Sequence, residues 1–196
     1  MIEIITNDYR QFQIPNGFGF VEMDLGCGRG KFTLELAKRF PERLVIASDV
    51  MIGRLRRLEA KVEKRNLANV RLLRAESGQA AEFQLPLHSI DRLHLLCPDP
   101  WPKDRRKARR LVSTSFLCTL RRVLKPGGIL HLSTDHEPYW LDWKRMIDNM
   151  PFFSKDMSAI DDVSDIKTDF ELQWLAEGKA VNHLAYRICY SNYGSN

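Results

Sequence analysis

DLGCGRG, residues 24–30, joins a short apolar run at residues 20–25 to a segment with helical periodicity at residues 31–40. Glycine adopts positive φ readily and has no Cβ, so this spacing allows a tight turn that a ligand can approach closely. A nicotinamide-binding G-x-G-x-x-G loop would need its third glycine at position 31, where this chain has Lys31. The stretch therefore predicts a strand, a ligand-binding loop and a helix, but not a nicotinamide site.

Short apolar runs and helical patterns alternate along the rest of the chain. Strands are expected at residues 20–25, 44–48, 70–74, 93–97, 129–133 and 183–189, and helices at residues 31–40, 52–66, 113–124 and 139–149. The breaker KPGG, residues 125–128, is expected to close the third helix. The polar stretch at residues 154–167 is expected to be the most flexible part. This alternation predicts an α/β fold with a single doubly wound, mostly parallel sheet, in which ligands bind beyond the carboxyl ends of the strands.

Length and composition are those of an ordinary globular protein. The 196 residues suit a single domain, 1–196, with a full hydrophobic core. The cysteines form no CxxC pair and the histidines show no metal-ligand spacing, so neither a disulfide framework nor a metal site is expected. His94 and His131 fall in strands and are expected to be hydrogen-bonded core groups. Without a secretory signal or an apolar run of membrane-spanning length, the protein is expected to be cytoplasmic and to make no membrane contact; its oligomeric state is left open.

An acidic residue follows each of the first three strands. Asp24 opens the glycine loop, Asp49 follows the second strand and Glu76 follows the third. One such acid alone could be a helix or loop cap. Three of them beside a G-x-G-x-G loop favour S-adenosylmethionine, because its amine and sulfonium are cationic and its ribose and adenine can also bind carboxylates. The expected cofactor-binding residues are Asp24, Gly26, Gly28, Gly30, Asp49 and Glu76.

Asp99 follows the fourth strand between Pro98 and Pro100, and Trp101 comes directly after. The prolines fix φ on both sides of the acid, which reduces the entropy lost in presenting its carboxylate, and the indole offers a flat face for a base. A rigid turn with a core-packed tryptophan would also fit the prolines. The basic run that follows, in a chain of net charge +5, favours contact with phosphates over a merely solvated face. Its residues are Lys103, Arg105, Arg106, Lys107, Arg109 and Arg110. The basic helix at residues 52–66 also carries acids and is expected to be solvated surface.

The stretch PDPWPK at residues 98–103, followed by Arg105 and by Arg109-Arg110, closely resembles the PDPWPKKRHxKRR signature of the tRNA (guanine-N7-)-methyltransferases. Other matches lie in register over about residues 20–190. Asp24 stands at the acid of the family's E-x-G-x-G-x-G loop, and Asp49 and Glu76 match its next two cofactor-binding acids. Thr134-Asp135 is similar to its A-T-D segment, and Thr168-Asp169-Phe170-Glu171 to its T-x-F-E motif. The chain departs from the pattern at Arg106-Lys107-Ala108, where the family has His-x-Lys, and at residues 165–166, where it often has arginine.

The resemblance implies a class I methyltransferase with a Rossmann-like fold, which moves a methyl group from S-adenosylmethionine to N7 of a guanine in the tRNA variable loop. It implies that Asp99 binds the donor and is also catalytic. The basic residues that follow Lys103 would contact the tRNA backbone. The implied substrate-binding residues are Lys103, Asp135, Thr168, Asp169, Phe170 and Glu171.

This reaction requires little of the protein. Guanine N7 has an in-plane lone pair and no proton, so no general base is needed, and a carboxylate can hold the guanine or stabilise its growing positive charge. Asp99 is expected in this role, with Asp135 as the second candidate. Two rival functions are methylation of another RNA base or an exocyclic amine, for which the loop order D-P-P-[YFW] would be typical, and RNA binding without catalysis, which leaves the donor site unexplained.

Overall fold

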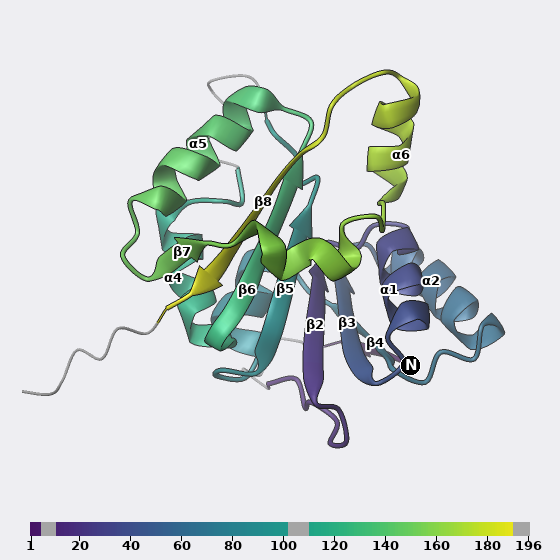
Figure 1. Cartoon of the computed structure of the whole chain (residues 1–196). Helices are drawn as coiled ribbons and strands as arrows, with labels where there is room; N and C mark the ends of the chain where they lie inside the picture. The colour runs from purple at the N-terminus through teal and green to yellow at the C-terminus, as the bar shows by residue number, and fades with distance from the viewer. Residues whose placement is uncertain (5–10, 102–109, 190–196) are drawn as a thin grey trace, which may run out of the picture.

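The computed structural model describes residues 1–4, 11–101 and 110–189 (Figure 1). The strands are β1 (Ile2–Ile4), β2 (Phe20–Leu25), β3 (Arg43–Asp49), β4 (Val70–Arg74), β5 (Ile90–Leu96), β6 (Leu124–Thr134), β7 (Phe153–Lys155) and β8 (Asn182–Ile188). The helices are α1 (Lys31–Arg39), α2 (Ile52–Lys64), α3 (Ser77–Gln79), α4 (Thr114–Val123), α5 (Glu137–Asp148) and α6 (Asp169–Ala176), with a π-helical turn η1 (Ala80–Gln84) and a 3₁₀ helix η3 (Met157–Val163). None of the helices within these ranges is long and apolar enough to cross a lipid bilayer.

All the described strands form one sheet in the order β1-β4-β3-β2-β5-β6-β8-β7. Neighbouring strands are parallel from β1 to β6, whereas β8 runs antiparallel to both β6 and β7. The chain moves away from β2 in one direction through β3 and β4, and in the other through β5 and β6, so the strand order reverses between β2 and β5. This confirms the predicted doubly wound, mostly parallel sheet and places its ligand-binding crevice at the carboxyl ends of these two strands.

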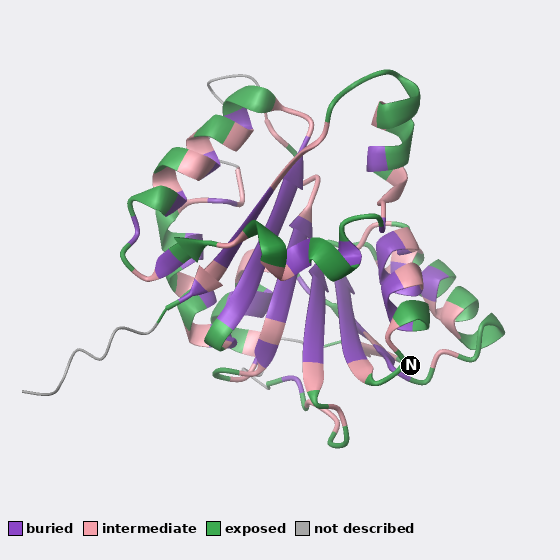
Figure 2. Ribbon diagram, viewed as in Figure 1, coloured by how far each residue is buried: buried purple, intermediate pink, exposed green. Residues whose placement is uncertain are grey.

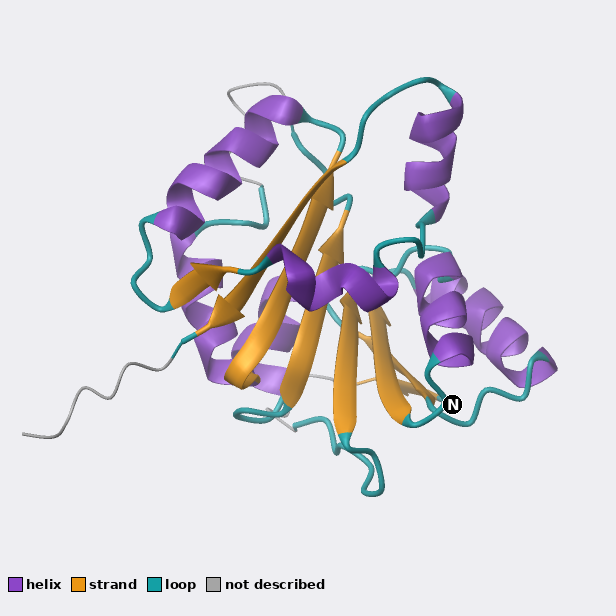
Figure 3. Cartoon of the chain, viewed as in Figure 1, coloured by secondary structure: helices purple, strands orange, loops and turns teal. Residues whose placement is uncertain are grey.

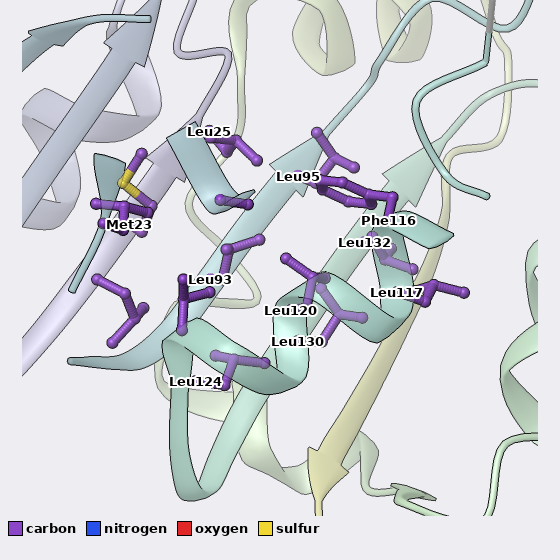
Figure 4. Packing of buried hydrophobic residues seen from close by; sticks show 14 of the residues in the cluster. Met23, Leu25, Leu93, Leu95, Phe116, Leu117, Leu120, Leu124, Leu130 and Leu132 are labelled. Atoms are coloured by element: carbon purple, nitrogen blue, oxygen red, sulfur yellow. The ribbon is translucent and has the colours of Figure 1, made fainter. Parts of the chain in front are cut away.

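Two hydrophobic clusters cover the two faces of the sheet, because successive side chains of a strand point to opposite faces. On β3, Leu44 and Ile46 belong to the first cluster, and Val45 and Ala47 belong to the second. The first cluster packs leucines of β5 and β6 against α4, as Figure 4 shows for Leu120 and its neighbours. The second lies under α1, α2 and η3, so helices flank the sheet on both sides and its central strands are buried between them (Figures 2 and 3).

Residues 154–167 are folded against the sheet, so the expectation of a flexible stretch is wrong. Ile160 and Val163 of η3 are buried in the second cluster. Asp162 forms ion pairs with Arg92 at 2.7 Å and with Arg43 at 2.8 Å, both of which lie on central strands. The polar composition of the segment suggested flexibility. The contacts that hold it could not be foreseen, because the partner residues lie far away in the sequence.

The breaker at residues 125–128 ends α4 at Val123, as predicted, but it does not form a loop. Strand β6 begins at Leu124, which pairs with Ile90, and the register between β5 and β6 shifts between Ile90 and Arg92. Gly127 has φ of 75°, a value that suits glycine. The strand is therefore longer at its start than apolar periodicity indicates.

Candidate active site

Two adjoining pockets lie at the carboxyl edge of the sheet. The glycine-loop pocket, of about 160 Å³, lies between the loop after β2, Asp24, Phe32 and the N-terminal turn of α6. The Asp99 pocket, of about 250 Å³, lies between the end of β3 and the loop that carries Asp99 and Trp101. Both pockets are lined by Gly26, Arg54 and Leu96. They therefore form the two ends of one cleft, at the crevice that the strand order predicts.

The glycine loop uses a backbone conformation that other residues rarely adopt. Gly26, Gly28 and Gly30 have φ of 83°, 57° and 75°. The N–H groups of Gly26 and Cys27 both donate to the Ser48 carbonyl, at 2.9 and 2.8 Å, which ties the loop to the end of β3. Gly30 also packs tightly: a Cβ there would lie 2.6 Å from Cδ2 of Leu58 on α2. Turn geometry and packing thus explain the glycines that the sequence marks as cofactor-binding.

Asp24 is a buried acid that faces the glycine-loop pocket. Its side chain is 3% exposed, and its Oδ2 accepts a hydrogen bond of 2.5 Å from the Thr33 hydroxyl on α1. Burial raises the pKa of Asp24 to about 6, although the hydrogen bond from Thr33 acts to lower it. A carboxylate that is held away from water at a pocket wall gains from a bound cation, which would restore the favourable interaction that burial removes.

Asp49 lines the Asp99 pocket and also holds the local backbone together. Its Oδ1 accepts the Met51 N–H at 2.7 Å, and its Oδ2 accepts the Gly28 N–H at 3.1 Å and an Arg54 guanidinium N–H at 3.2 Å. These contacts include the loop cap that the sequence leaves possible. Asp49 therefore joins the glycine loop to α2, and its predicted contact with ribose stays a prediction.

Glu76 follows β4, as predicted, and is exposed beside the cleft. Its Oε2 accepts the Gln79 N–H at 2.9 Å and so caps the short helix α3. The next residue, Ser77, lines the Asp99 pocket. The structure thus brings Glu76 to the rim of the cleft, and its predicted contact with adenine stays a prediction.

Asp99 is exposed in a short loop with unusual backbone geometry. Cys97 and Trp101, which flank the Pro98–Pro100 segment, have φ of 55° and 41°, in the left-handed region that costs most residues about 1 kcal/mol or more. The Cys97 N–H donates to the Ser133 carbonyl at 2.8 Å, which fixes the start of the loop to β6. The prolines are thus part of a loop that holds the Asp99 carboxylate at the pocket.

Arg110 fixes the other side of this loop. Its Nε donates to the Pro100 carbonyl at 2.8 Å, and its Nη1 pairs with Asp142 at 2.8 Å on α5. Its guanidinium also lies 4.6 Å from the centre of the Tyr139 ring. Lys103, Arg105, Arg106, Lys107 and Arg109 of the predicted basic run lie outside the described residues. Contact with the tRNA backbone stays a prediction for the five basic residues after Lys103, and contact with the substrate stays a prediction for Lys103.

The predicted T-x-F-E segment forms the first turn of α6. Thr168, Asp169 and Phe170 line the glycine-loop pocket. Glu171 is buried instead: its Oε1 lies 3.0 Å from Nε2 of His183 and 2.9 Å from the Lys167 ammonium. Although burial acts in the opposite direction, the hydrogen bonds from these two groups hold the pKa of Glu171 below its usual value. The structure therefore brings three of the four residues to the cleft and places the fourth behind it.

Asp135 follows β6 at the same edge of the sheet and is half-buried. It is not part of the described lining of either pocket. Burial raises the pKa of the Cys97 thiol at the start of the Asp99 loop, and the negative charge of Asp135 acts in the same direction. It stays the second candidate for guanine positioning, one strand further from the glycine loop than Asp99.

A basic groove that the sequence did not indicate adjoins the cleft. It has a volume of about 570 Å³ and is lined by Arg29 of the glycine loop together with Met51, Arg54, Arg57 and Lys61. The last three of these residues share one face of α2 because they are spaced by three and four positions. Arg54 also lines both pockets, so the groove and the cleft share this residue. The sequence shows the spacing of these basic residues, but it does not show which face of α2 lies beside the glycine loop.

Comparisons with known proteins agree with this architecture. A family model described as putative methyltransferase matches residues 19–184. A tRNA (guanine-N(7)-)-methyltransferase of Neisseria meningitidis is 33% identical over 178 residues, which cover 88% of this chain and 71% of that protein. One of Thermotoga maritima is 31% identical over 159 residues, and the match covers 81% of this chain but only 51% of that protein, so the chain spans about half of this relative's length.

A solved structure shares the fold. The crystal structure of a SAM-dependent methyltransferase from Aquifex aeolicus superposes with a TM-score of 0.61 at 18% identity, covering 87% of this chain and 83% of that one. The predicted class I methyltransferase fold is thereby confirmed. By its family match and its relatives, the chain belongs to the tRNA (guanine-N(7)-)-methyltransferase family.

Proposed function

We propose that this protein transfers a methyl group from S-adenosylmethionine to N7 of a guanine in the variable loop of tRNA. The observation that carries the proposal is the cleft itself: a buried carboxylate beside a positive-φ glycine loop at one end, and an exposed carboxylate on a rigid loop at the other. The names of the relatives support the same substrate. The proposed location is the cytoplasm, where tRNA is present, and the reaction needs no metal.

The glycine-loop pocket suits the cationic end of the donor. The Asp24 carboxylate would pair with the methionine amine, and the open backbone at Gly26 and Gly28 would let the methionine portion lie against the loop. Asp49 and Glu76, further along the same edge, would hold the ribose and the adenine. When bound, S-adenosylmethionine supplies an electrophilic methyl group on a sulfonium. The other residues of the cleft then have only to orient that methyl group and exclude water.

The Asp99 pocket would hold the donor ribose at its Asp49 side and receive the guanine at its Asp99 side. N7 uses its own lone pair to form the new bond and has no proton to lose, so Asp99 acts as a positioning and stabilising anion rather than as a base. Trp101 lines the same pocket and offers a ring on which the base can stack. A carboxylate that only positions and stabilises predicts a shallow dependence of the chemical step on pH near neutrality.

The tRNA backbone would contact basic residues of two parts of the chain. The basic groove on α2 adjoins the glycine-loop pocket, and the basic run from Lys103 follows the Asp99 loop in sequence. Neutralised phosphates release counterions, which makes such binding strong at low salt and weak at high salt. Asp135 and the first turn of α6 would also contact the substrate.

The test is methyl transfer from labelled S-adenosylmethionine to unmodified bulk tRNA, followed by nucleoside analysis. The expected product is 7-methylguanosine, and a tRNA transcript with adenine in place of the variable-loop guanine should remain unlabelled. A different methylated nucleoside would keep the donor site and assign the enzyme to another base. Donor binding without transfer to any tRNA would overturn the proposed substrate.

A further inference from the structure

Three histidines form a continuous hydrogen-bonded chain between two buried carboxylates. Glu22 Oε2 lies 2.9 Å from Nε2 of His94, and Nδ1 of His94 lies 2.9 Å from Nδ1 of His131. Nε2 of His131 then lies 3.0 Å from Nδ1 of His183, whose Nε2 lies 3.0 Å from Glu171 Oε1. The histidines lie on the neighbouring strands β5, β6 and β8, so the chain crosses the sheet toward α6.

The number of protons in this chain follows from its hydrogen bonds. Four consecutive contacts need four N–H groups, because each ring nitrogen and each carboxylate oxygen takes part in only one of them. Three neutral imidazoles carry three protons, one each. Ionised carboxylates supply none. The chain is therefore fully satisfied only if it holds one proton more than its neutral rings provide.

Both terminal carboxylates are held in the ionised form by other partners. Glu22 accepts hydrogen bonds from Arg92 at 2.9 and 2.7 Å and from Arg43 at 2.8 Å. Although burial acts in the opposite direction, Arg92 and His94 hold the pKa of Glu22 below its usual value. Lys167 lies against Glu171 in the same way. The extra proton therefore belongs to a ring.

His183 is the ring that can best carry it. His94 and His131 are fully buried, and burial, together with the Arg92 charge, lowers the pKa of both. His183 is partly open to solvent, with 22% of its side chain exposed, and it directly faces a carboxylate. With both nitrogens of His183 protonated, every contact in the chain has one donor and one acceptor.

This chain ends at Glu171, the buried residue of α6. The other residues of the helix are exposed or partly exposed, including Phe170 at 53% and Leu175 at 48%, and the helix stands apart from the sheet (Figures 1 and 2). Glu171 also closes the capping box: its Oε2 accepts the Thr168 N–H at 3.4 Å, and Thr168 Oγ1 accepts the Glu171 N–H at 3.0 Å. Thr168 lines the glycine-loop pocket, so the anchor of the helix also sets one wall of the pocket.

We propose that His183 is a positioning residue. As an imidazolium, it carries the extra proton of the histidine chain and holds the first turn of α6 against the methyl-donor pocket. The inference rests on the proposed function in one respect, that this pocket takes the donor. Loss of the extra proton leaves a lone pair on His183 Nε2 facing the Glu171 carboxylate, so this hydrogen bond is lost, the helix loosens and donor affinity falls. The charged groups that face the chain are Glu171, Lys167, Glu22, Arg92, Arg43 and Asp162.

Two variants distinguish the effect of the extra proton from the effect of losing the histidine side chain. His183→Phe breaks two contacts, and we expect donor affinity to fall about 10-fold, with kcat at saturating donor changed less than about twofold, because a hydrogen bond to a charged group is worth about 1.5 kcal/mol or more. Glu171→Gln supplies the fourth N–H from its own amide, so the fall in donor affinity that follows loss of the His183 proton should be absent in this variant. His88→Asn serves as a control, because His88 lies elsewhere and has φ of 45°, which asparagine tolerates.

The measurements are calorimetric binding of S-adenosylhomocysteine between pH 6 and 9 and nitrogen NMR of histidine-labelled protein. One imidazolium at His183 at neutral pH, lost in Glu171→Gln, is the expected spectrum. A spectrum with three neutral imidazole rings, or an unchanged donor affinity in His183→Phe, would overturn the inference and leave the proposed function standing. Absence of binding by the wild-type protein would instead overturn the donor site, and the role of His183 with it.

Discussion

The two ends of the cleft present their carboxylates in opposite ways. At the glycine-loop pocket, Asp24 is buried, and the surrounding backbone makes its turn through glycines at positive φ. At the Asp99 pocket, the acid is exposed, and the residues in the left-handed region are Cys97 and Trp101, which have side chains. The first end avoids backbone strain and accepts the free-energy penalty of a buried charge. The second accepts strain and leaves its charge in water.

This difference suits the two ligands that we propose. A small donor with a fixed cation can compensate a buried carboxylate, whereas a guanine in a large RNA must reach an acid that is already accessible. Arg110 and the Ser133 carbonyl hold the strained loop in place from either side. The difference predicts that changes at the Asp99 end act on turnover, and that changes at the glycine-loop end act on donor binding and stability.

The largest effect is expected for Asp99→Ala. Loss of one electrostatic group at the reacting base should lower kcat by about 10²- to 10³-fold. Donor affinity should change less than about threefold, because a hydrogen bond to a solvated group contributes little. Single-turnover transfer to tRNA and calorimetric donor binding measure the two effects, with Glu137→Ala on the exposed start of α5 as the control. A variant with the full rate would remove Asp99 from the mechanism.

Asp24→Asn should show the reverse pattern. It keeps an acceptor for Thr33 but loses the charge that we propose pairs with the donor amine, so donor affinity should fall about 10- to 100-fold while kcat at saturating donor changes little. In the wild type, donor affinity should rise as pH increases through about 6, where Asp24 ionises. An affinity that is flat from pH 5 to 8 would contradict this assignment.

The same variant should make the free protein more stable. Between about pH 4 and pH 6, folded Asp24 holds a proton that the unfolded chain has released, so stability falls as pH rises through this window. The neutral amide of Asp24→Asn does not carry this penalty, and we expect a gain of about 2–3 kcal/mol in the free energy of unfolding at pH 7 but almost none at about pH 3.5. Urea denaturation at the two pH values measures the gain, and equal gains at both would refute its cause.

Gly30→Ala tests the packing of the glycine-loop end. The new methyl group would lie 2.6 Å from Leu58 Cδ2, at φ of 75°, so we expect a loss of about 2–4 kcal/mol from overpacking and strain together. Gly28→Ala has the positive φ but open space, and should lose only about 1 kcal/mol. Gly53→Ala, in α2 with open space, should be neutral or stabilising. Equal losses at the first two positions would show that packing against Leu58 does not matter.

The smallest effect is expected in the basic groove. Arg57→Ala should weaken tRNA binding about threefold at moderate salt and should reduce the slope of log affinity against log salt by about one. Lys38→Ala, exposed in the last turn of α1 and outside the groove, should leave the slope unchanged. Filter binding over a range of salt concentrations measures both. An unchanged slope for Arg57→Ala would exclude the groove from the phosphate contacts.

Local patterns predicted the glycine loop and most strands because their causes are local. The DLGCGRG stretch contains its own turn, and the acids after successive strands meet because parallel strands end at one edge. Residues 154–167 and Glu171 were different. Asp162 is held by Arg92 and Arg43, and Glu171 by His183, all of them distant partners that only the fold brings together. The face of α2 that carries Arg54 was missed for the same reason.

The position of β8 in the sheet limits when β7 and α6 can reach their folded arrangement during synthesis. It follows the other described strands in the chain, yet it lies inside the sheet between β6 and β7. Until a ribosome has released residues 182–188, β7 has no neighbour in the sheet, and Glu171 has no histidine to bind. The glycine loop and α1 do not depend on these residues, but the wall that α6 provides does. A nascent chain thus acquires the α6 wall of the glycine-loop pocket only after residues 182–188 have been translated and released.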